Sequence, residues 1–459
     1  MTMNKVESSF KDPSGFVFKK DDIFYRAVNP IYKDNYDLLM QSGLYEELVK
    51  KGYLVSHCEV ELKGFEDAYK IIKPLQIPFI TYPYEWSFSQ LKDTALLTLK
   101  IQMVALKFGM SLKDASAYNI QFIDGKPVFI DTLSFEKYKE GTSWVAYKQF
   151  CQHFLAPLLL MSYRDIRLNQ LLKTNIDGIP IDLTEALLPN LKKLNPSVFF
   201  HIYMHSKFQK KYEDKDIDFK KTTHVSKSQL ININKNLQDT INGLKYPAKQ
   251  SEWGEYYTFT NYTDDAFENK KGIINSFLDT VNPKFLWDLG ANNGLFTRIA
   301  SQRGINSVAF DIDPVACEKN YLTIKRNGEK NLLPVLFDLT NPSPSIGWAN
   351  CERENISKRA VPDVIMALAL IHHIAISNNV PLFDIAKYFS SLSEYLILEF
   401  VPKSDSQVEK LLATREDVFP NYNEEGFEEA FSSFYKIVNK VKIEGSERTL
   451  YLMKRTKNG

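Results

Sequence analysis

The sequence predicts an α/β protein in which a separate α+β domain precedes a half built on a parallel sheet. Three observations lead to this prediction. An apolar run at residues 285–287 is followed by a turn with two glycines and by a helical pattern near Leu295. A second apolar run at 307–310 ends, like the first, in an aspartate. A charged stretch without helical or strand periodicity, 209–224, divides this half from the one before it.

Length and composition indicate a globular protein of about two to three domains. The 459 residues exceed one ordinary core, and 44% hydrophobic with 25% charged residues allow a sizeable interior. Lysine and arginine total 57 against 56 for aspartate and glutamate, so the net charge of +1 creates no global field for nucleic acid or a membrane surface. We therefore expect neither nucleic-acid binding nor membrane insertion.

The cysteines and the first residues indicate the compartment. Cys58, Cys151, Cys317 and Cys351 show no Cys-x-x-Cys spacing, which argues against a zinc site or a disulfide framework. The N-terminal residues contain no apolar signal core, and no stretch approaches the length of a membrane span. We expect a reducing, cytoplasmic compartment and no metal site.

The first half shows hairpin and helix patterns in order. Residues 14–29 predict a β-hairpin around a Lys-Lys-Asp-Asp turn, and helical stretches follow at 35–41 and 44–51. An apolar run at 77–82 predicts a strand, and a long helix is expected over 89–108, where apolar residues recur at helical spacing.

The next stretch carries polar residues around a short hairpin. Asp124-Gly125 is a strong two-residue turn signal between two apolar runs, and Asp114, Asn119 and Asp131 surround it. A loop with Asp-x-x-x-x-Asn, a hairpin and a later Asp resembles the catalytic centre of kinase-like phosphotransferases. That resemblance implies that Asp114 orients a hydroxyl while Asn119 and Asp131 hold magnesium against the phosphates of ATP.

The same stretch departs from the kinase-like pattern. Lys113 precedes Asp114 where His-Arg or His-Gly would stand, Asp131-Thr-Leu replaces Asp-Phe-Gly, and the first hairpin has one glycine instead of three. A degenerate scaffold and a coincidence of turn residues, with Asp114 and Asn119 capping a turn, therefore remain alternatives.

The rest of the first half predicts helices. Residues 144–163 are apolar almost all round and predict a buried helix broken near Pro157, with His153 in its core. Helical patterns continue to about 207, and a connecting helix is expected over 229–245. We therefore divide the chain into an N-terminal α+β domain, a linker with connecting helix, and a C-terminal domain, at 1–210, 211–245 and 246–459.

The glycine turn of the second half indicates an adenosine-containing ligand. Asp288 ends the first strand, and Gly290 and Gly294 bracket a turn that permits close approach of the backbone. Asp311 ends the next strand, where a carboxylate is placed to accept both hydroxyls of a ribose. A dinucleotide fold would use Gly-x-Gly-x-x-Gly, whereas an acid facing the loop suits a cationic amino-acid tail and repels a pyrophosphate.

At these residues the sequence resembles the class I S-adenosylmethionine-dependent methyltransferases, whose first motif is Asp-x-Gly-x-x-x-Gly. Asp338 follows a third apolar run where this superfamily contacts the adenine amino group, and 363–374 and 395–400 match its fourth and fifth strands. The resemblance implies a Rossmann-like seven-stranded methyltransferase sheet closed by a final strand pair at 438–443 and 449–453. It also implies S-adenosyl-L-methionine as cofactor, bound by Asp288, Gly290, Asn292, Gly294, Asp311 and Asp338.

Acceptor and base residues are expected near the same strand ends. A base is needed only when the nucleophile arrives protonated, and His372 or His373 is the first candidate, with Glu399 second. Either histidine could instead cap the strand or pack under the cofactor. The loop at 340–359 and the aromatic cluster at 253–262 are expected to help shape the pocket, the cluster through cation–π attraction to a sulfonium, or simply to pack on the sheet.

Three hypotheses follow. The first is an S-adenosylmethionine-dependent methyltransferase that acts on an unidentified small-molecule or cell-surface acceptor; an oxygen acceptor is favoured by elimination. The second is a bifunctional or ATP-binding phosphotransferase-like protein that uses the first half, and the third is a protein that holds the cofactor without turnover. The whole arrangement also resembles bacterial methyltransferase-like proteins related to rhizobial nodulation host-specificity proteins.

Overall fold

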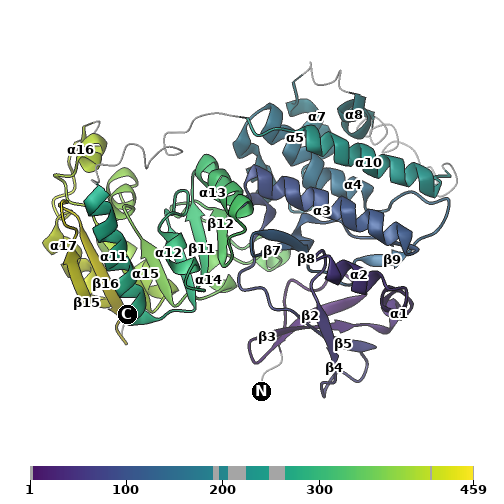
Figure 1. Cartoon of the computed structure of the whole chain (residues 1–459), viewed down its shortest axis with the longest axis horizontal. Coiled ribbons are helices and arrows are strands. Elements are labelled where there is room, and N and C mark those ends of the chain that lie inside the picture. Colours follow the sequence, from purple (N-terminus) through teal and green to yellow (C-terminus); the bar gives the residue numbers. More distant parts are fainter. Residues whose placement is uncertain (1–3, 190–195, 205–223, 248–263, 414–415, 458–459) are drawn as a thin grey trace. The chain divides into compact units, whose positions relative to one another are not determined.

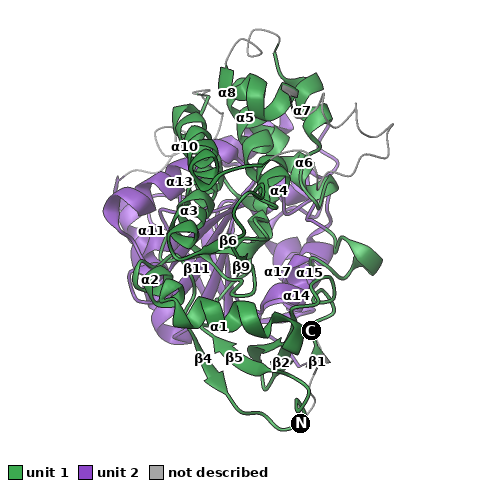
Figure 2. Ribbon diagram, turned by 90° about the vertical axis from the view of Figure 1, so that its right-hand side faces the viewer, with its two compact units in different colours: residues 1–248, 344–354 green, residues 249–343, 355–459 purple. Residues whose placement is uncertain are grey.

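The computed structural model describes residues 4–189, 196–204, 224–247, 264–413 and 416–457. The chain forms two compact units, which Figure 2 colours separately. Unit 1 comprises residues 1–248 and 344–354, and unit 2 comprises 249–343 and 355–459. The predicted boundaries near 210 and 246 stay predictions, because 205–223 and 248–263 lie outside the described residues. None of the described helices is long and apolar enough to cross a lipid bilayer.

Unit 1 begins with a five-stranded antiparallel sheet in the order β1-β2-β3-β5-β4 (Figure 1). The strands are β1 (Asn4–Lys5), β2 (Gly15–Lys20), β3 (Ile23–Val28), β4 (His57–Val60) and β5 (Lys70–Pro74). The predicted hairpin at 14–29 is confirmed. The strand predicted at 77–82 is wrong: that run contains Pro78, which cannot donate to a ladder, and β5 forms before it instead.

The remainder of unit 1 is mainly helical, with two small two-stranded sheets. These pair β6 (Met110–Leu112) with β9 (Phe135–Lys137) and β7 (Ile120–Ile123) with β8 (Lys126–Phe129). The Asp124-Gly125 turn has positive φ at both residues, as the hairpin prediction requires. The helices are α1 (Lys33–Gln41), α2 (Leu44–Lys50), α3 (Phe88–Lys107), α4 (Tyr147–Phe150), α5 (Ala156–Tyr163), α6 (Leu171–Thr174), α7 (Ile181–Leu187), α8 (Pro196–Val198) and α10 (Lys227–Gly243).

Helix α3 is the centre of the helical part. Its N-cap Ser87 accepts a hydrogen bond from the backbone of Gln90, whose side chain reaches back to the Ser87 N–H, so a capping box defines the start. Helix α10 packs beside it (Figure 1), and the Lys92 ammonium donates to the carbonyls of Asn242 and Leu244 at its end. The break predicted near Pro157 takes the form of a π-helical turn, Cys151–Leu155, just before α5.

Unit 2 is a seven-stranded mixed sheet in the order β12-β11-β10-β13-β14-β16-β15. The first five strands in this order are parallel, and β16 runs antiparallel to both of its neighbours. The strands are β10 (Phe285–Leu289), β11 (Asn306–Asp311), β12 (Leu332–Leu336), β13 (Val364–Ala367), β14 (Tyr395–Phe400), β15 (Tyr435–Lys442) and β16 (Thr449–Arg455). Apolar runs predicted β10, β11 and β12, because strands covered on both faces show near-continuous apolar sequence. The other four strands were expected from the resemblance to class I methyltransferases.

The helices of unit 2 connect and cover these strands. They are α11 (Asp264–Val281), α12 (Thr297–Ser301), α13 (Pro314–Asn327), α14 (Ile356–Arg359), α15 (Leu382–Leu392), α16 (Ser406–Leu412) and α17 (Glu424–Ser432). A shared core joins α11 and α12 to the central strands, with Ile274, Phe277 and Ala300 packed against Leu286 and Met366. This packing covers β10 and β13, whose carboxyl ends lie side by side in the sheet.

Candidate cofactor site

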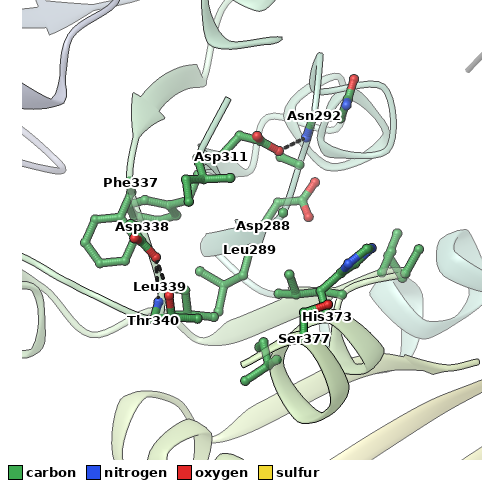
Figure 3. Close-up of a pocket in the computed structure, with 18 of the residues that line it drawn as sticks. Asp288, Leu289, Asn292, Asp311, Phe337, Asp338, Leu339, Thr340, His373 and Ser377 are labelled. Carbon is green, nitrogen blue, oxygen red and sulfur yellow. Dashed lines mark hydrogen bonds between the residues drawn. The ribbon is translucent and has the colours of Figure 1, made fainter. Parts of the chain in front are cut away.

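A cavity of about 450 Å³ lies at the carboxyl ends of the parallel strands of unit 2. Strand order reverses beside β10, since β11 follows on one side and β13 on the other, and such a switch point is where open α/β sheets bind ligands. Figure 3 shows the lining side chains. The lining includes Lys270, Asp288, Gly290, Asn292, Phe296, Asp311, Phe337, Asp338, Thr340, Ala369, Leu370 and His373.

The first turn brings backbone close to the cavity. Gly290 has φ +75° and Asn292 has φ +51°, and the N–H groups of Gly290 and Ala291 both donate to the Phe310 carbonyl at 2.9 Å. A Cβ at Gly290 would stand 3.1 Å from the Leu370 side chain, so the position is both left-handed and closely packed. The turn therefore ties the end of β10 to the end of β11.

Gly294 has a different role from Gly290. It is not among the described residues that line the cavity, although it was predicted as a cofactor-binding residue. A Cβ there would lie 2.5 Å from the Asn320 side chain of α13 and 2.9 Å from that of Arg298, and φ is +77°. The glycine allows the turn to pack on α13, and its predicted role in cofactor binding stays a prediction.

A buried carboxylate, Asp288, ends β10 and a partly buried one, Asp311, ends β11. Asp288 is 2% exposed and accepts a hydrogen bond of 2.5 Å from the Thr297 hydroxyl. Burial raises its pKa to about 7, against the hydrogen bond from Thr297. Asp311 accepts from the backbone N–H groups of Asn292 at 2.7 Å and Asp313 at 2.8 Å, and burial raises its pKa to about 6. Both carboxylates are thus held in place by short hydrogen bonds.

The third predicted acid follows β12. Asp338 accepts from the backbone N–H of Thr340 at 2.9 Å and from its hydroxyl at 2.7 Å (Figure 3). The Phe337 N–H donates to the Asp311 carbonyl at 2.8 Å, and the Phe337 ring meets Phe310 edge-on with centroids 5.3 Å apart. Asp311 and Asp338 are therefore fixed in relation to each other along one wall that also carries an aromatic ring.

The three predicted catalytic residues lie in different surroundings. His373 opens the π-helical turn His373–Ser377 and lines the cavity, and burial lowers its pKa to about 4. His372 is 1% exposed, is not among the lining residues, and has no hydrogen-bond partner at either ring nitrogen within the described structure. Glu399 is fully buried and holds Lys270 at 2.6 Å and the Ala369 N–H at 2.8 Å. Only His373 reaches the cavity wall.

Lys270 is a cavity residue that the sequence analysis missed. It lies on α11, is 2% exposed and places its ammonium 4.5 Å from the centre of the Phe296 ring. A signal existed, because Ala266, Lys270, Ile273, Ile274 and Phe277 share the buried stripe of α11. A lysine at an apolar position of a helix indicates a buried partner.

Residues predicted for ATP and magnesium lie together in unit 1. Burial raises the pKa of Asp114, and the nearby Asp131 raises it further. Asn119 donates to the Ser134 hydroxyl, which donates to Asp131 at 2.7 Å. However, the Arg26 guanidinium lies 2.6 Å from Asp131, so a cation from the chain already pairs with that carboxylate. Among the described residues no group of three or more His, Cys, Asp or Glu could hold a metal ion.

The predicted pocket loop at 340–359 is divided. Thr340 lines the cavity, whereas residues 344–354 belong to unit 1. There the buried Glu352 lies 2.7 Å from the Lys11 ammonium, and the Arg353 guanidinium stacks 3.9 Å from the Tyr118 ring. The aromatic cluster at 253–262 lies outside the described residues, so its role stays a prediction.

Comparison with known proteins gives a near full-length match. Nodulation protein NoeA of Rhizobium meliloti (strain 1021) is 36% identical over 462 residues, which cover 98% of this chain and 96% of that protein. No protein-family model matches the chain.

Solved structures give partial matches. The bifunctional kinase-methyltransferase WbdD is 14% identical over 42% of this chain and 40% of its own, with a TM-score of 0.31. N-methyltransferase NodS from Bradyrhizobium japonicum WM9 is 10% identical over 42% of this chain and 98% of its own, also with a TM-score of 0.31. Magnesium protoporphyrin IX methyltransferase (ChlM) from Synechocystis PCC 6803, with bound SAH, is 14% identical over 44% of this chain and 92% of its own, with a TM-score of 0.32. The chain thus spans less than half of WbdD, and likenesses at these scores carry no argument about activity.

Proposed function

The chain belongs to the family of nodulation protein NoeA, and on this premise we propose that it is an S-adenosylmethionine-dependent methyltransferase that works at the cavity of unit 2. The name of this relative refers to nodulation and specifies no chemical reaction. The proposed reaction therefore rests on the residues of the site. Three carboxylates, Asp288, Asp311 and Asp338, come from the ends of three adjacent parallel strands and line one cavity. This arrangement is the observation that carries the proposal.

The residues present fit the cofactor in charge and shape. Asp288 suits the ammonium of the methionine end, and Asp311 at the tip of the next strand suits the two ribose hydroxyls. Asp338 and the Phe337 ring suit the amino group and the face of adenine. A cavity of about 450 Å³ is in the range of sites for small molecules. The strand order, with β16 antiparallel beside β14, supports the same assignment.

The bound cofactor would supply a methyl group already activated on a sulfonium. The protein then mainly has to position the acceptor in line with that methyl group. Among the described residues that line the cavity, His373 suits removal of a proton, because its lowered pKa keeps the imidazole neutral above about pH 4. Glu399 instead orients Lys270. We propose that the acceptor is an oxygen nucleophile of a small or cell-surface molecule.

Calorimetric titration with S-adenosylhomocysteine tests the cofactor site without knowledge of the acceptor. We expect one site per chain in the wild type, and an affinity at least about 10-fold weaker in Asp311→Asn, which loses charge-assisted hydrogen bonds to the ribose. Asp279→Asn is the matched control, since it removes one carboxylate of unit 2 from an exposed position that is not part of the cavity lining. Equal affinities of the wild type and Asp311→Asn would contradict the proposal.

A second candidate function is nucleotide binding in unit 1. Its support is the proximity of Asp114 and Asp131, since the charge of Asp131 raises the pKa of Asp114. For magnesium to bind, Arg26 would have to leave Asp131. Titration with a non-hydrolysable ATP analogue and magnesium tests this directly: binding that is lost in Asp131→Asn supports it, and no heat of binding rejects it.

A further inference from the structure

Residues 344–354, which we call the docking loop, form a closed structure within unit 1. Ile346 and Arg353 exchange two backbone hydrogen bonds, at 3.0 and 3.1 Å, and so make an antiparallel bridge. Inside the loop, the Trp348 N–H donates to the Glu352 carboxylate at 2.8 Å. Because the two ends and the turn are tied to each other, the docking loop has one defined shape and can act as a unit.

An ion pair and a hydrogen bond attach the docking loop to the rest of unit 1. Glu352 is 7% exposed, and its carboxylate lies 2.7 Å from the Lys11 ammonium. The Glu354 N–H donates to the Tyr82 hydroxyl at 2.8 Å. A buried carboxylate that loses its cationic partner is costly, so the ion pair favours this one position of the docking loop.

A third attachment is aromatic. The Arg353 guanidinium stacks 3.9 Å from the centre of the Tyr118 ring, which is a cation–π geometry. Tyr118 in turn meets the buried His153 edge-on, with ring centroids 5.9 Å apart. It stands in the chain between Asp114 and Asn119. The docking loop is thereby fixed to the polar loop of unit 1 through a ring that is itself packed.

The chain that enters the docking loop comes directly from the cavity wall. Asp338 accepts hydrogen bonds from the Thr340 N–H at 2.9 Å, from the Thr340 hydroxyl at 2.7 Å and from the Asn341 N–H at 3.2 Å. The docking loop begins at the fourth residue after Thr340. Four residues span at most about 14 Å when fully extended. A displacement of the docking loop would therefore pull on the residues that hold Asp338.

We infer that the docking loop positions Asp338 for the adenine of the cofactor, so that its attachment to unit 1 sets the base selectivity of the cavity. This inference rests on the proposed function, in which Asp338 accepts from the adenine amino group. The docking loop contributes no residue to the described lining of the cavity, so Glu352 and Arg353 act through Asp338 and are positioning residues. An anchored wall need not be ordered when the ligand binds, which favours binding.

A comparison of two ligands reports the position of Asp338. The first is S-adenosylhomocysteine and the second is S-inosylhomocysteine, which carries a carbonyl oxygen in place of the adenine amino group. We expect the wild type to bind the first at least about 10-fold more tightly by calorimetry, because the Asp338 carboxylate meets a donor in adenine and an acceptor in hypoxanthine. The ratio of the two affinities is the quantity to follow, since a general loss of structure weakens both ligands alike.

The test variant is Lys11→Met/Tyr82→Phe. It removes the ammonium that pairs with Glu352 and the hydroxyl that accepts from Glu354, and both changes lie in unit 1 outside the cavity lining. We expect its preference for S-adenosylhomocysteine to fall by at least about threefold, because the docking loop is less firmly held. If this variant does not fold, Lys11→Met alone serves, since the Lys11 side chain is 53% exposed.

The matched control is Lys33→Met/Tyr69→Phe. It also removes one lysine and one tyrosine hydroxyl from unit 1, here from around Asp37, which is not part of the docking loop. It should keep the wild-type preference.

Hydrogen exchange of the wild type gives a second readout. If docking of the loop favours binding of S-adenosylhomocysteine, the ligand must favour docking by the same factor. Peptides that cover 344–354 should therefore exchange more slowly when S-adenosylhomocysteine is bound, although they contribute nothing to the described cavity lining. A loop with a purely structural role in unit 1 would exchange at the same rate with and without the ligand.

The outcomes separate this inference from the proposed function. An unchanged preference in Lys11→Met/Tyr82→Phe, an equal fall in the control, or exchange of 344–354 that ignores the ligand overturns the positioning role and leaves the cofactor site intact. Equal binding of the two ligands to the wild type overturns the contact between Asp338 and adenine, and the inference with it. No binding of either ligand to the folded wild type overturns the proposed function itself.

Discussion

Asp288→Asn is expected to stabilise the unliganded protein at alkaline pH while it weakens binding of S-adenosylhomocysteine. The reason is the burial of Asp288, which is 2% exposed and has its pKa raised from 3.8 to about 7. A carboxyl whose pKa is raised on folding binds its proton more tightly in the folded state, so stability falls as the pH rises between these two values. The ionised Asp288 carboxylate therefore lowers the stability of the unliganded protein, while the same charge is expected to bind the ligand.

The magnitude follows from the size of the pKa shift. Each pKa unit corresponds to about 1.4 kcal/mol, so a rise of about three units destabilises the ionised folded protein by about 4 kcal/mol above pH 7. At pH 5 only the pH interval from 3.8 to 5 contributes, so the destabilisation is less than about 2 kcal/mol. Asparagine has no charge to bury and can still accept from Thr297. The variant should therefore exceed the wild type in stability by about 2–4 kcal/mol at pH 8, and by clearly less at pH 5.

Urea unfolding of the ligand-free proteins at pH 8 and pH 5, followed by circular dichroism, measures this difference. Hydrogen exchange of the peptides over β10 and β11 reports the same change within unit 2. Asp279→Asn serves as control, because Asp279 is exposed and its replacement should change stability by less than about 1 kcal/mol. The reasoning is refuted if Asp288→Asn is less stable than the wild type at pH 8, or if the difference does not shrink at pH 5.

Four further expectations concern single positions. Gly294→Ala should lower the free energy of unfolding by about 1–3 kcal/mol in urea, and Asn320→Ala should restore part of it, since the new Cβ lies 2.5 Å from that amide. Arg448→Met should lower it by about 3–5 kcal/mol, because the buried Glu399 and Asp405 lose their shared partner; a calorimetric melt that matches the wild type would contradict this. Asp131→Asn should leave the affinity for S-adenosylhomocysteine within about twofold by titration calorimetry, as its carboxylate pairs with an arginine of unit 1. The His373 imidazole should titrate near pH 4 by NMR, with His373→Asn used for assignment; titration near 6.5 would mean that the ring is solvated.

Local patterns of the chain predicted the first strands of unit 2, and the resemblance to class I methyltransferases implied the rest of the sheet. Near-continuous apolar runs mark buried parallel strands, and a turn with glycine at positive φ marks the start of a ligand-binding loop; both signals are confined to a few neighbouring residues. Asp288, Asp311 and Asp338 follow such runs, and the carboxyl ends of parallel strands must meet at one edge of the sheet. The resemblance to rhizobial nodulation proteins, stated from the same residues, is confirmed by the near full-length relative.

Turn and strand signals were equally local. One prediction was wrong because a proline within an apolar run was given too little weight. The run at 77–82 was predicted as a strand because it is apolar, but Pro78 interrupts it and the sheet of unit 1 is completed by β5. Gly294 was predicted to bind the cofactor because it stands in a motif, and this role stays a prediction; the close approach that requires glycine within the protein is to Asn320. A motif shows which type of residue stands at a position, but it does not show which neighbouring group makes that type necessary.

Periodicity and turn chemistry over a few residues indicated most strands and helices and the acids at the strand ends, because those properties are local. Which distant residues meet depends on how the elements pack. Lys270 and Glu399 are 129 positions apart and pair only because α11 packs on the sheet beside β14. Residues 344–354 lie between two strands of unit 2 and yet fold with unit 1. Such pairings depend on packing across the whole chain, and no local pattern of residues specifies them.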